Sequence, residues 1–134
     1  DREFNLTTKT LKENTMSTEK YLVNCLEGAN NVERATISFI LATTASKTCE
    51  TAIFLMADAS RLCTKGGADG LVHEGYEPIS DLIKQFAANG GKIWLCPICA
   101  KSKGIIEEDL LENAEIAGAP KTMAFLASGA KLLA

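Results

Sequence analysis

Short apolar runs alternate with segments of helical spacing from residue 20 onward. Continuous apolar runs are typical of strands buried on both faces of a parallel sheet, and they occur at residues 21–26, 50–56, 92–95, 114–117 and 131–133. Helices are predicted at residues 32–46, 79–87, 97–103 and 120–127, with shorter helical patches at 59–63 and 107–113. This alternation indicates one α/β domain, in which a mostly parallel sheet of about five strands has helices on both faces.

The helix at 32–46 has apolar residues on more than one of its faces. One stripe consists of Val32, Ala35, Phe39 and Ala42. Ile37, Ile40 and Leu41 point elsewhere, whereas a surface helix of a small monomer needs a single apolar stripe. The excess predicts that this helix is buried against a second subunit.

The ends of the two longest predicted helices have recognisable residues. Asn30 and Asn31 can cap the first of these helices. Glu33 is placed to accept a hydrogen bond from the Asn30 backbone, as in a capping box. Pro78 opens the second helix, and Gly90 ends it. These signals support the predicted boundaries.

Composition limits the class of protein further. The 134 residues, 46% of them hydrophobic, suit one compact domain, which we expect over residues 20–134 after a polar tail at 1–19. A balance of 17 acidic against 14 basic residues gives a net charge of −3, so no nucleic-acid partner is expected. No apolar run approaches the ~20 residues that cross a bilayer, and the amino end is too polar for a signal peptide. We therefore expect a cytoplasmic protein with no membrane partner.

The chain has five cysteines and one histidine. An odd number leaves one thiol over in a fully paired disulfide framework, so core fillers, metal ligands and reactive thiols are the alternatives. Cys25, Cys49 and Cys63 are interpreted as buried fillers. No second CxxC or HxxxH spacing completes a zinc site, and no glycine pattern matches a phosphate-binding loop. We therefore predict no metal and no cofactor.

Three of the predicted strands end in chemically useful side chains. In parallel sheets, ligands bind beyond the carboxyl ends of the strands, where the direction of winding reverses. Here those ends are followed by Asn24-Cys25-Leu26-Glu27-Gly28, Asp58 and Cys96-Pro97-Ile98-Cys99. The last of these is the strongest signal in the chain, and Asn24, Cys25 and Glu27 are weaker candidates for lining the same pocket.

Cys96 directly precedes Pro97, a favoured first helical residue, so Cys96 is predicted to be a helix N-cap. Free backbone N–H groups and the helix dipole at that position lower the pKa of a thiol. Lys101 and Lys103 add positive charge, and Cys99, one turn further, could resolve a disulfide. A thioredoxin-type reading is disfavoured, because in those folds the motif follows an early strand.

His73 and Glu74 form the other conspicuous polar pair. Position 77 is Glu, so the second histidine of HExxH is missing and a metalloprotease is excluded. On the residues alone, a surface loop is the simpler interpretation of this pair.

Several separated motifs occur in the order found in the DsrE/DsrF family: NCLEG, ERATISFILATTA, FLM, HEGYEP, GGKIWLCPICAKSKGI and DLLENAEIAGAP. The chain resembles this family from about residue 20 onward, which implies a flavodoxin-like three-layer α/β/α sandwich, a homo-oligomer (trimer or hexamer) and a role in sulfur relay. The resemblance implies Cys96 as the residue that carries a persulfide, with Cys99 as the second thiol of a CPxC variant. Lys103 stands where the family usually has Arg, which keeps the charge but loses the bidentate fork. The resemblance also favours His73 and Glu74 as pocket residues.

Three functions remain open. In the first, Cys96 takes sulfur from a sulfane donor, holds it as a persulfide and passes it to an acceptor, with or without turnover as a sulfurtransferase. In the second, Cys96 and Cys99 act as a thiol-disulfide oxidoreductase or a peroxiredoxin-like redox pair. In the third, the chain is a non-enzymatic oligomeric module that binds a small ligand, and the thiols have no chemical role.

Overall fold

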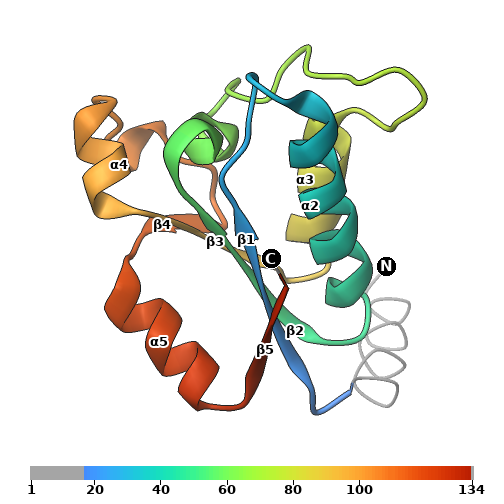
Figure 1. The fold of residues 1–134 in the computed structure, drawn as a ribbon, viewed down its shortest axis with the longest axis vertical. Helices are drawn as coiled ribbons and strands as arrows, with labels where there is room; N and C mark the ends of the chain where they lie inside the picture. Colours follow the sequence, from blue (N-terminus) through green and yellow to red (C-terminus); the bar gives the residue numbers. More distant parts are fainter. Residues whose placement is uncertain (1–16, 134) are drawn as a thin grey trace, which may run out of the picture.

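A computed structural model describes residues 17–133, so most of the tail predicted at 1–19 lies outside the described residues. The five predicted strands form one sheet in which every neighbouring pair is parallel, in the order β4-β3-β2-β1-β5 (Figure 1). Their bounds are β1 Lys20–Cys25, β2 Glu50–Leu55, β3 Lys92–Leu95, β4 Ala114–Ile116 and β5 Ala130–Leu133. The predicted α/β class with a five-stranded parallel sheet is therefore confirmed.

Helices cover both faces of this sheet, as predicted. The four helices described are α2 Val32–Ser46, α3 Ile79–Ala88, α4 Pro97–Ser102 and α5 Ala119–Ala127. Figure 1 shows α2 and α3 on one side of the sheet and α5 on the other, which gives three layers. None of the helices in residues 17–133 is long and apolar enough to cross a membrane.

Two 3₁₀ segments, η1 Ala57–Cys63 and η2 Glu107–Asp109, replace the shorter helical patches. The patch predicted at 107–113 is wrong in length, because the backbone turns extended at Leu110. Leu110 forms an antiparallel bridge with Thr64, and only 5% of it is exposed. Burying this leucine in the core ends the helical turn.

Strand side chains alternate between the two faces and build two clusters. The larger cluster faces α2 and α3, where Phe39 and Phe86 pack edge to face with ring centroids 6.4 Å apart. The smaller cluster faces α5 and contains Leu22 and Trp94, with Phe125 of α5 edge-on against the Trp94 indole. The connection after β3 packs into the larger cluster through Ala100 and Ile105, and α4 itself lies beside η1 at the carboxyl end of the sheet (Figure 1).

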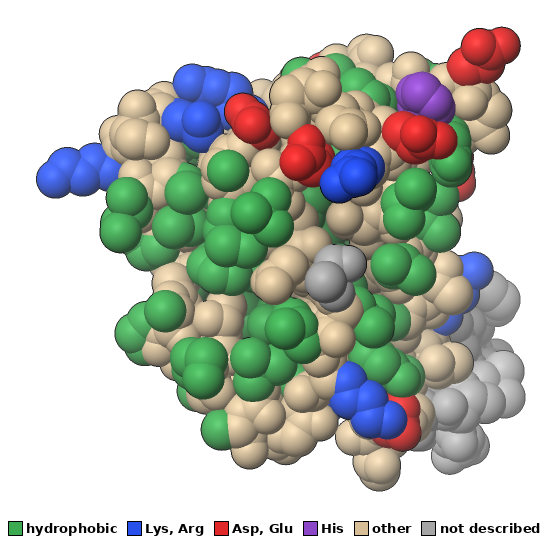
Figure 2. Space-filling view, in the orientation of Figure 1, with side chains coloured by type: hydrophobic (Ala, Val, Ile, Leu, Met, Phe, Trp, Pro, Cys, Tyr) green, Lys and Arg blue, Asp and Glu red, His purple; other side chains and the backbone are tan. Residues whose placement is uncertain are grey.

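The α5 face is covered only in part. Phe54 and Met56 are half-buried there, and 51% of Leu132 is exposed. A cavity of about 200 Å³ is lined by Leu22, Asn24, Phe54, Met56, Thr122, Leu126 and Leu132. Figure 2 shows hydrophobic side chains gathered on this side of the molecule, between the positions of α4 and α5. One helix is too little to cover five strands.

The amino end of α2 is capped by Asn31, whose side-chain oxygen accepts from the Arg34 N–H at 3.2 Å. The capping box predicted for Asn30 and Glu33 is wrong. Asn30 binds within the preceding loop, and Glu33 accepts a hydrogen bond from the Tyr76 hydroxyl at 3.0 Å. Glu33 thus binds Tyr76, which is distant in the sequence, and not its neighbour Asn30.

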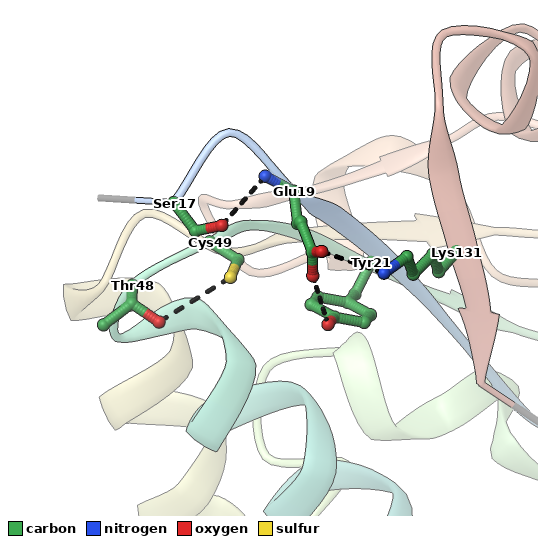
Figure 3. Close-up of polar contacts among 6 residues, drawn as sticks. All are labelled: Ser17, Glu19, Tyr21, Thr48, Cys49 and Lys131. Carbon is green, nitrogen blue, oxygen red and sulfur yellow. Dashed lines mark hydrogen bonds and ion pairs between the residues drawn. The ribbon is translucent and has the colours of Figure 1, made fainter. Parts of the chain in front are cut away.

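The amino end of the sheet is closed by contacts between β1 and β5 (Figure 3). The Lys131 ammonium lies 2.9 Å from one Glu19 oxygen, and the Tyr21 hydroxyl donates to the other at 2.8 Å. This pair is exposed and contributes little stability by itself. It marks the end of the molecule opposite the site described next.

Candidate thiol site

Cys96 and Cys99 begin the short helix α4 at the carboxyl end of β3. The Cys96 N–H donates to the Leu55 carbonyl at 3.0 Å, which continues the β2–β3 ladder by one residue. Cys96 is the N-cap and Pro97 the first helical residue, as predicted. The Cys96 side chain makes no capping hydrogen bond, so the prediction was wrong about what the thiol contacts.

The backbone N–H that reaches a sulfur belongs to Ala57 and binds Cys99. It comes from the turn that follows β2, and its nitrogen lies 3.3 Å from Cys99 Sγ. This hydrogen bond is the largest cause of a lowered pKa of the Cys99 thiol, partly opposed by desolvation. The neighbouring Cys96 and Ser60 side chains, and then the charge of Lys103, lower this pKa further. Cys99 is thus the residue of the pair at which the surroundings favour a thiolate.

The turn that presents this N–H has an unusual backbone. Ala57 has φ of 50°, the only positive φ of a non-glycine residue in the described chain. Conformations of this kind cost roughly 1–2 kcal/mol for a residue with a side chain. The Ser60 hydroxyl donates to the Ala57 carbonyl at 2.7 Å, which fastens the turn to η1.

A second link holds η1 against α4. The Arg61 guanidinium donates to the Lys103 carbonyl at 3.0 Å, at the end of α4. Together with the Ala57 bond to Cys99, this joins the two segments at two points along α4. The spacing between the Ala57 amide and Cys99 is thereby set from both sides.

The pair lies where the connections of two neighbouring strands diverge. The chain after β3 passes to the α2/α3 side, and the chain after β4 passes to α5 on the opposite side. Gly118, which follows β4, lies against Pro97, and a β-carbon built on Gly118 would be 3.0 Å from Pro97 Cδ. Positions where the connections diverge in this way are where α/β sheets are expected to bind ligands.

The two lysines predicted beside the pair differ in their relation to it. Lys103 is half-buried, and its charge acts on Cys99. Lys101 is exposed on α4. Lys103 is therefore the lysine that belongs to the site in this structure.

The strand-end candidates of β1 lie in a different groove. Asn24 and Glu27 line a hollow of about 400 Å³ together with Arg34 and Ile37 of α2. Asn24 also lines the cavity on the α5 face. Neither lining includes the cysteine pair, so the structure does not bring these side chains together with it.

His73 and Glu74 lie on the loop over the amino end of α2. His73 Nε2 is 3.7 Å from Glu33 Oε2, and its ring centroid is 5.5 Å from that of Tyr76. Glu74 is exposed. Within one chain this loop contacts α2 through Glu33, and the structure does not bring His73 or Glu74 together with Cys96 and Cys99.

The remaining cysteines are buried away from the pair. Burial raises the pKa of the Cys25 thiol to about 11 and that of Cys63 to about 12. Cys25 therefore belongs to the core and does not line a pocket. Cys49 precedes β2 at the opposite end of the sheet, with its sulfur 3.6 Å from Thr48 Oγ1 (Figure 3). Among residues 17–133, no three His, Cys, Asp or Glu side chains converge as metal ligands.

Ala57, Ser60 and Arg61 are the site residues that the sequence did not indicate. Ala57 acts through its backbone N–H, and Arg61 acts through its guanidinium, which donates to the Lys103 carbonyl. Alanine has no chemical function that a motif search could recognise. The one available signal was the position of the segment directly after a buried strand.

Several known proteins are similar to this chain. The model of the DsrE/DsrF-like family matches residues 19–134. An uncharacterized protein of Methanocaldococcus jannaschii is 36% identical over 109 residues, which are 81% of this chain and 39% of that protein. The chain thus spans about two fifths of the length of the curated relative it matches.

Two solved structures share the fold. The ychN protein of E. coli superposes with a TM-score of 0.60 at 18% identity, covering 88% of this chain and 100% of that one. A protein of unknown function from Methanobacterium thermoautotrophicum gives a TM-score of 0.60 at 10% identity, covering 87% and 98%. At these identities the likeness concerns the fold alone.

Proposed function

Because the chain belongs to the DsrE/DsrF-like family, we propose that it carries sulfane sulfur as a persulfide on Cys96 in a sulfur relay. The observation that carries this proposal is the placement of the thiols. Of five free cysteines, only Cys96 and Cys99 are partly exposed, and they lie together at the carboxyl edge of the sheet. Five free thiols suit a reducing compartment, which we take to be the cytoplasm.

Loading begins when the Cys96 thiol ionises and gives its proton to solvent. The Cys96 thiolate attacks the sulfane sulfur of the donor, and the donor's remaining part leaves with the bonding electron pair. With thiosulfate as donor, sulfite leaves and Cys96 holds the added sulfur as a persulfide anion. A nucleophilic acceptor then takes this outer sulfur.

Intact-mass spectrometry tests the proposal. After incubation with thiosulfate or polysulfide, the protein should gain the mass of one sulfur atom, and a reductant should remove it. Cys96→Ser should abolish the gain, whereas the matched control Cys49→Ser, at the opposite end of the sheet, should keep it. A sulfur adduct that persists in Cys96→Ser would refute Cys96 as the carrier.

A dithiol oxidoreductase or peroxidase is the second candidate. It is favoured by the same arrangement, in which a second thiol with a lowered pKa lies one turn from the first. This function predicts a reversible Cys96–Cys99 disulfide and turnover that depends on peroxide. Cys99→Ser should stop that turnover while leaving a sulfur adduct on Cys96, so one variant separates the two candidates.

We also propose that the protein is a homo-oligomer, a trimer or hexamer, whose contact includes the outer side of α2. There, 41% of Ile37 and 42% of Leu41 are exposed, and 50% of nearby Leu26. Sedimentation of Ile37→Glu should show smaller particles than the wild type, whereas Lys84→Glu on the exposed side of α3 serves as the control. A monomeric wild-type protein would refute this proposal.

A further inference from the structure

We propose that Cys99 discharges the sulfur from Cys96 as hydrosulfide, so that the protein reduces sulfane sulfur as well as carrying it. This inference rests on the proposed persulfide on Cys96. In the proposed step, Cys99 Sγ attacks Cys96 Sγ and a disulfide closes between them. The chain then acts as a sulfane-sulfur reductase that depends on an external dithiol.

The first support is the position of Cys99 relative to the bond that must break. Cys99 follows Cys96 by one helical turn at the start of α4, and the Cys96 side chain is near enough to lower the pKa of the Cys99 thiol. In the proposed step Cys99 attacks the inner sulfur of a persulfide on Cys96. Attack on the inner sulfur expels the outer one, whereas transfer to a separate acceptor needs attack on the outer sulfur.

The second support is the amide that serves Cys99 alone. The Ala57 N–H lies 3.3 Å from Cys99 Sγ, while the Cys96 side chain has no such capping bond. The rate of thiol exchange depends on the fraction of the attacking thiol that is ionised and on its access. The turn after β2 thus prepares the second cysteine of the pair as an attacking group. A simple carrier would have no use for this arrangement, because a neighbouring thiolate shortens the life of the persulfide.

The third support is that no other described cysteine can take this part. Cys25 and Cys63 are buried in the core, with 1% and 0% of their surfaces exposed. Cys49 lies at the amino end of the sheet, away from α4. The pair is therefore the one place in residues 17–133 where a persulfide could meet a second thiol of the same chain.

The step balances as follows. Cys99 passes its proton to the persulfide anion on Cys96, and the resulting Cys99 thiolate attacks Cys96 Sγ. The sulfur–sulfur bond between the two cysteines forms, the bond from Cys96 to the outer sulfur breaks, and hydrosulfide leaves with the bonding electrons and the proton. The sulfane sulfur gains two electrons, and the two cysteine sulfurs together lose two. An external dithiol resets the protein, being oxidised to its own disulfide as it reduces the Cys96–Cys99 bond.

The test follows a single turnover. Reduced protein is mixed with polysulfide, separated from excess reagent on a desalting column, and quenched with an alkylating bimane at successive times. Bimane-trapped hydrosulfide and the Cys96–Cys99 disulfide, mapped on non-reduced peptides, should appear at the same rate and in equal amounts. Cys99→Ser should keep its sulfur adduct and release hydrosulfide at least about tenfold more slowly. Cys49→Ser is the control and should behave as the wild type.

The outcomes separate this inference from the proposed function. A persulfide on Cys96 that is equally long-lived in the wild type and in Cys99→Ser would overturn the discharge step and leave sulfur carriage intact. Absence of any adduct in Cys99→Ser would overturn the carrier proposal and the discharge step together. Hydrosulfide release without the disulfide would also overturn the inference, since another electron source would then be acting.

Discussion

The five thiols should differ widely in their rates of alkylation in the native protein. With limiting iodoacetamide at pH 7, Cys99 should be labelled first, because its pKa is lowered by the Ala57 amide. Cys25 and Cys63 should be labelled last. Peptide mass spectrometry at successive times measures the order directly.

The expected slowing of alkylation at Cys25 and Cys63 follows from the pKa values of these two thiols. Burial raises the pKa of the Cys25 thiol from an ordinary 9.0 to about 11, and that of Cys63 to about 12. Each pKa unit changes the thiolate fraction at pH 7 about tenfold, so these fractions fall about 100-fold and about 1000-fold. Burial also blocks the reagent sterically, which makes both factors lower limits on the slowing.

The control is the same reaction in concentrated urea, where the differences should disappear because all five thiols are exposed to water. Labelling of native Cys25 or Cys63 within tenfold of the rate of Cys99 would refute the reasoning. Faster labelling of Cys99 in Cys96→Ser than in the wild type would show that the Cys96 thiol shields Cys99 more than it stabilises the thiolate. That result would contradict the role of Cys96 as a neighbour that lowers the pKa of the Cys99 thiol.

Three other changes probe the same structure. The free energy of unfolding should be constant below pH 9 and should fall above it by about 1.4 kcal/mol per pH unit for each of Cys25 and Cys63, because these thiols ionise at lower pH in the unfolded chain. Urea titrations of Cys63→Ala at several pH values should show a shallower fall. Gly28→Ala should cost about 1–3 kcal/mol in urea unfolding, since its β-carbon would lie 2.2 Å from the Asp58 carbonyl oxygen, and an unchanged midpoint would contradict this packing. Ala57→Gly should leave stability equal or raise it by about 1 kcal/mol, because glycine relieves the φ of 50° at some entropic cost, and a loss in the melting temperature would refute the strain.

The strands and long helices could be predicted because one physical rule decides each of them. Burial on both faces requires an apolar run, so the run at 50–56 predicted β2 at Glu50–Leu55. Packing on one side requires helical spacing, so the segment at 79–87 predicted α3 at Ile79–Ala88. The acidic patch at 107–113 failed because a single buried residue, Leu110, outweighed its helix propensity.

The candidate site could be predicted in its position but not in its bonding. The strand-end rule and Pro97 located Cys96 as the N-cap. The amide that binds Cys99 comes from Ala57, 42 residues before it in the chain, and its direction depends on the packing of η1 against α4. Local sequence patterns hold no information about such a contact. The same limit applies to Glu33, whose tertiary partner Tyr76 replaced the expected capping box.

The pairing of β1 with β5 has a consequence for how this protein folds during its synthesis on the ribosome. Glu19 and Lys131 are 112 residues apart, so β1 waits for its outer neighbour until nearly the whole domain has been made. At about 5–20 residues per second, the wait lasts roughly 5–20 s. During that time α5 has not yet been made, so the side of the sheet that carries Leu22 and Trp94 is exposed to water. The nascent chain therefore passes through a four-stranded stage with one bare apolar surface, at which chaperones would bind.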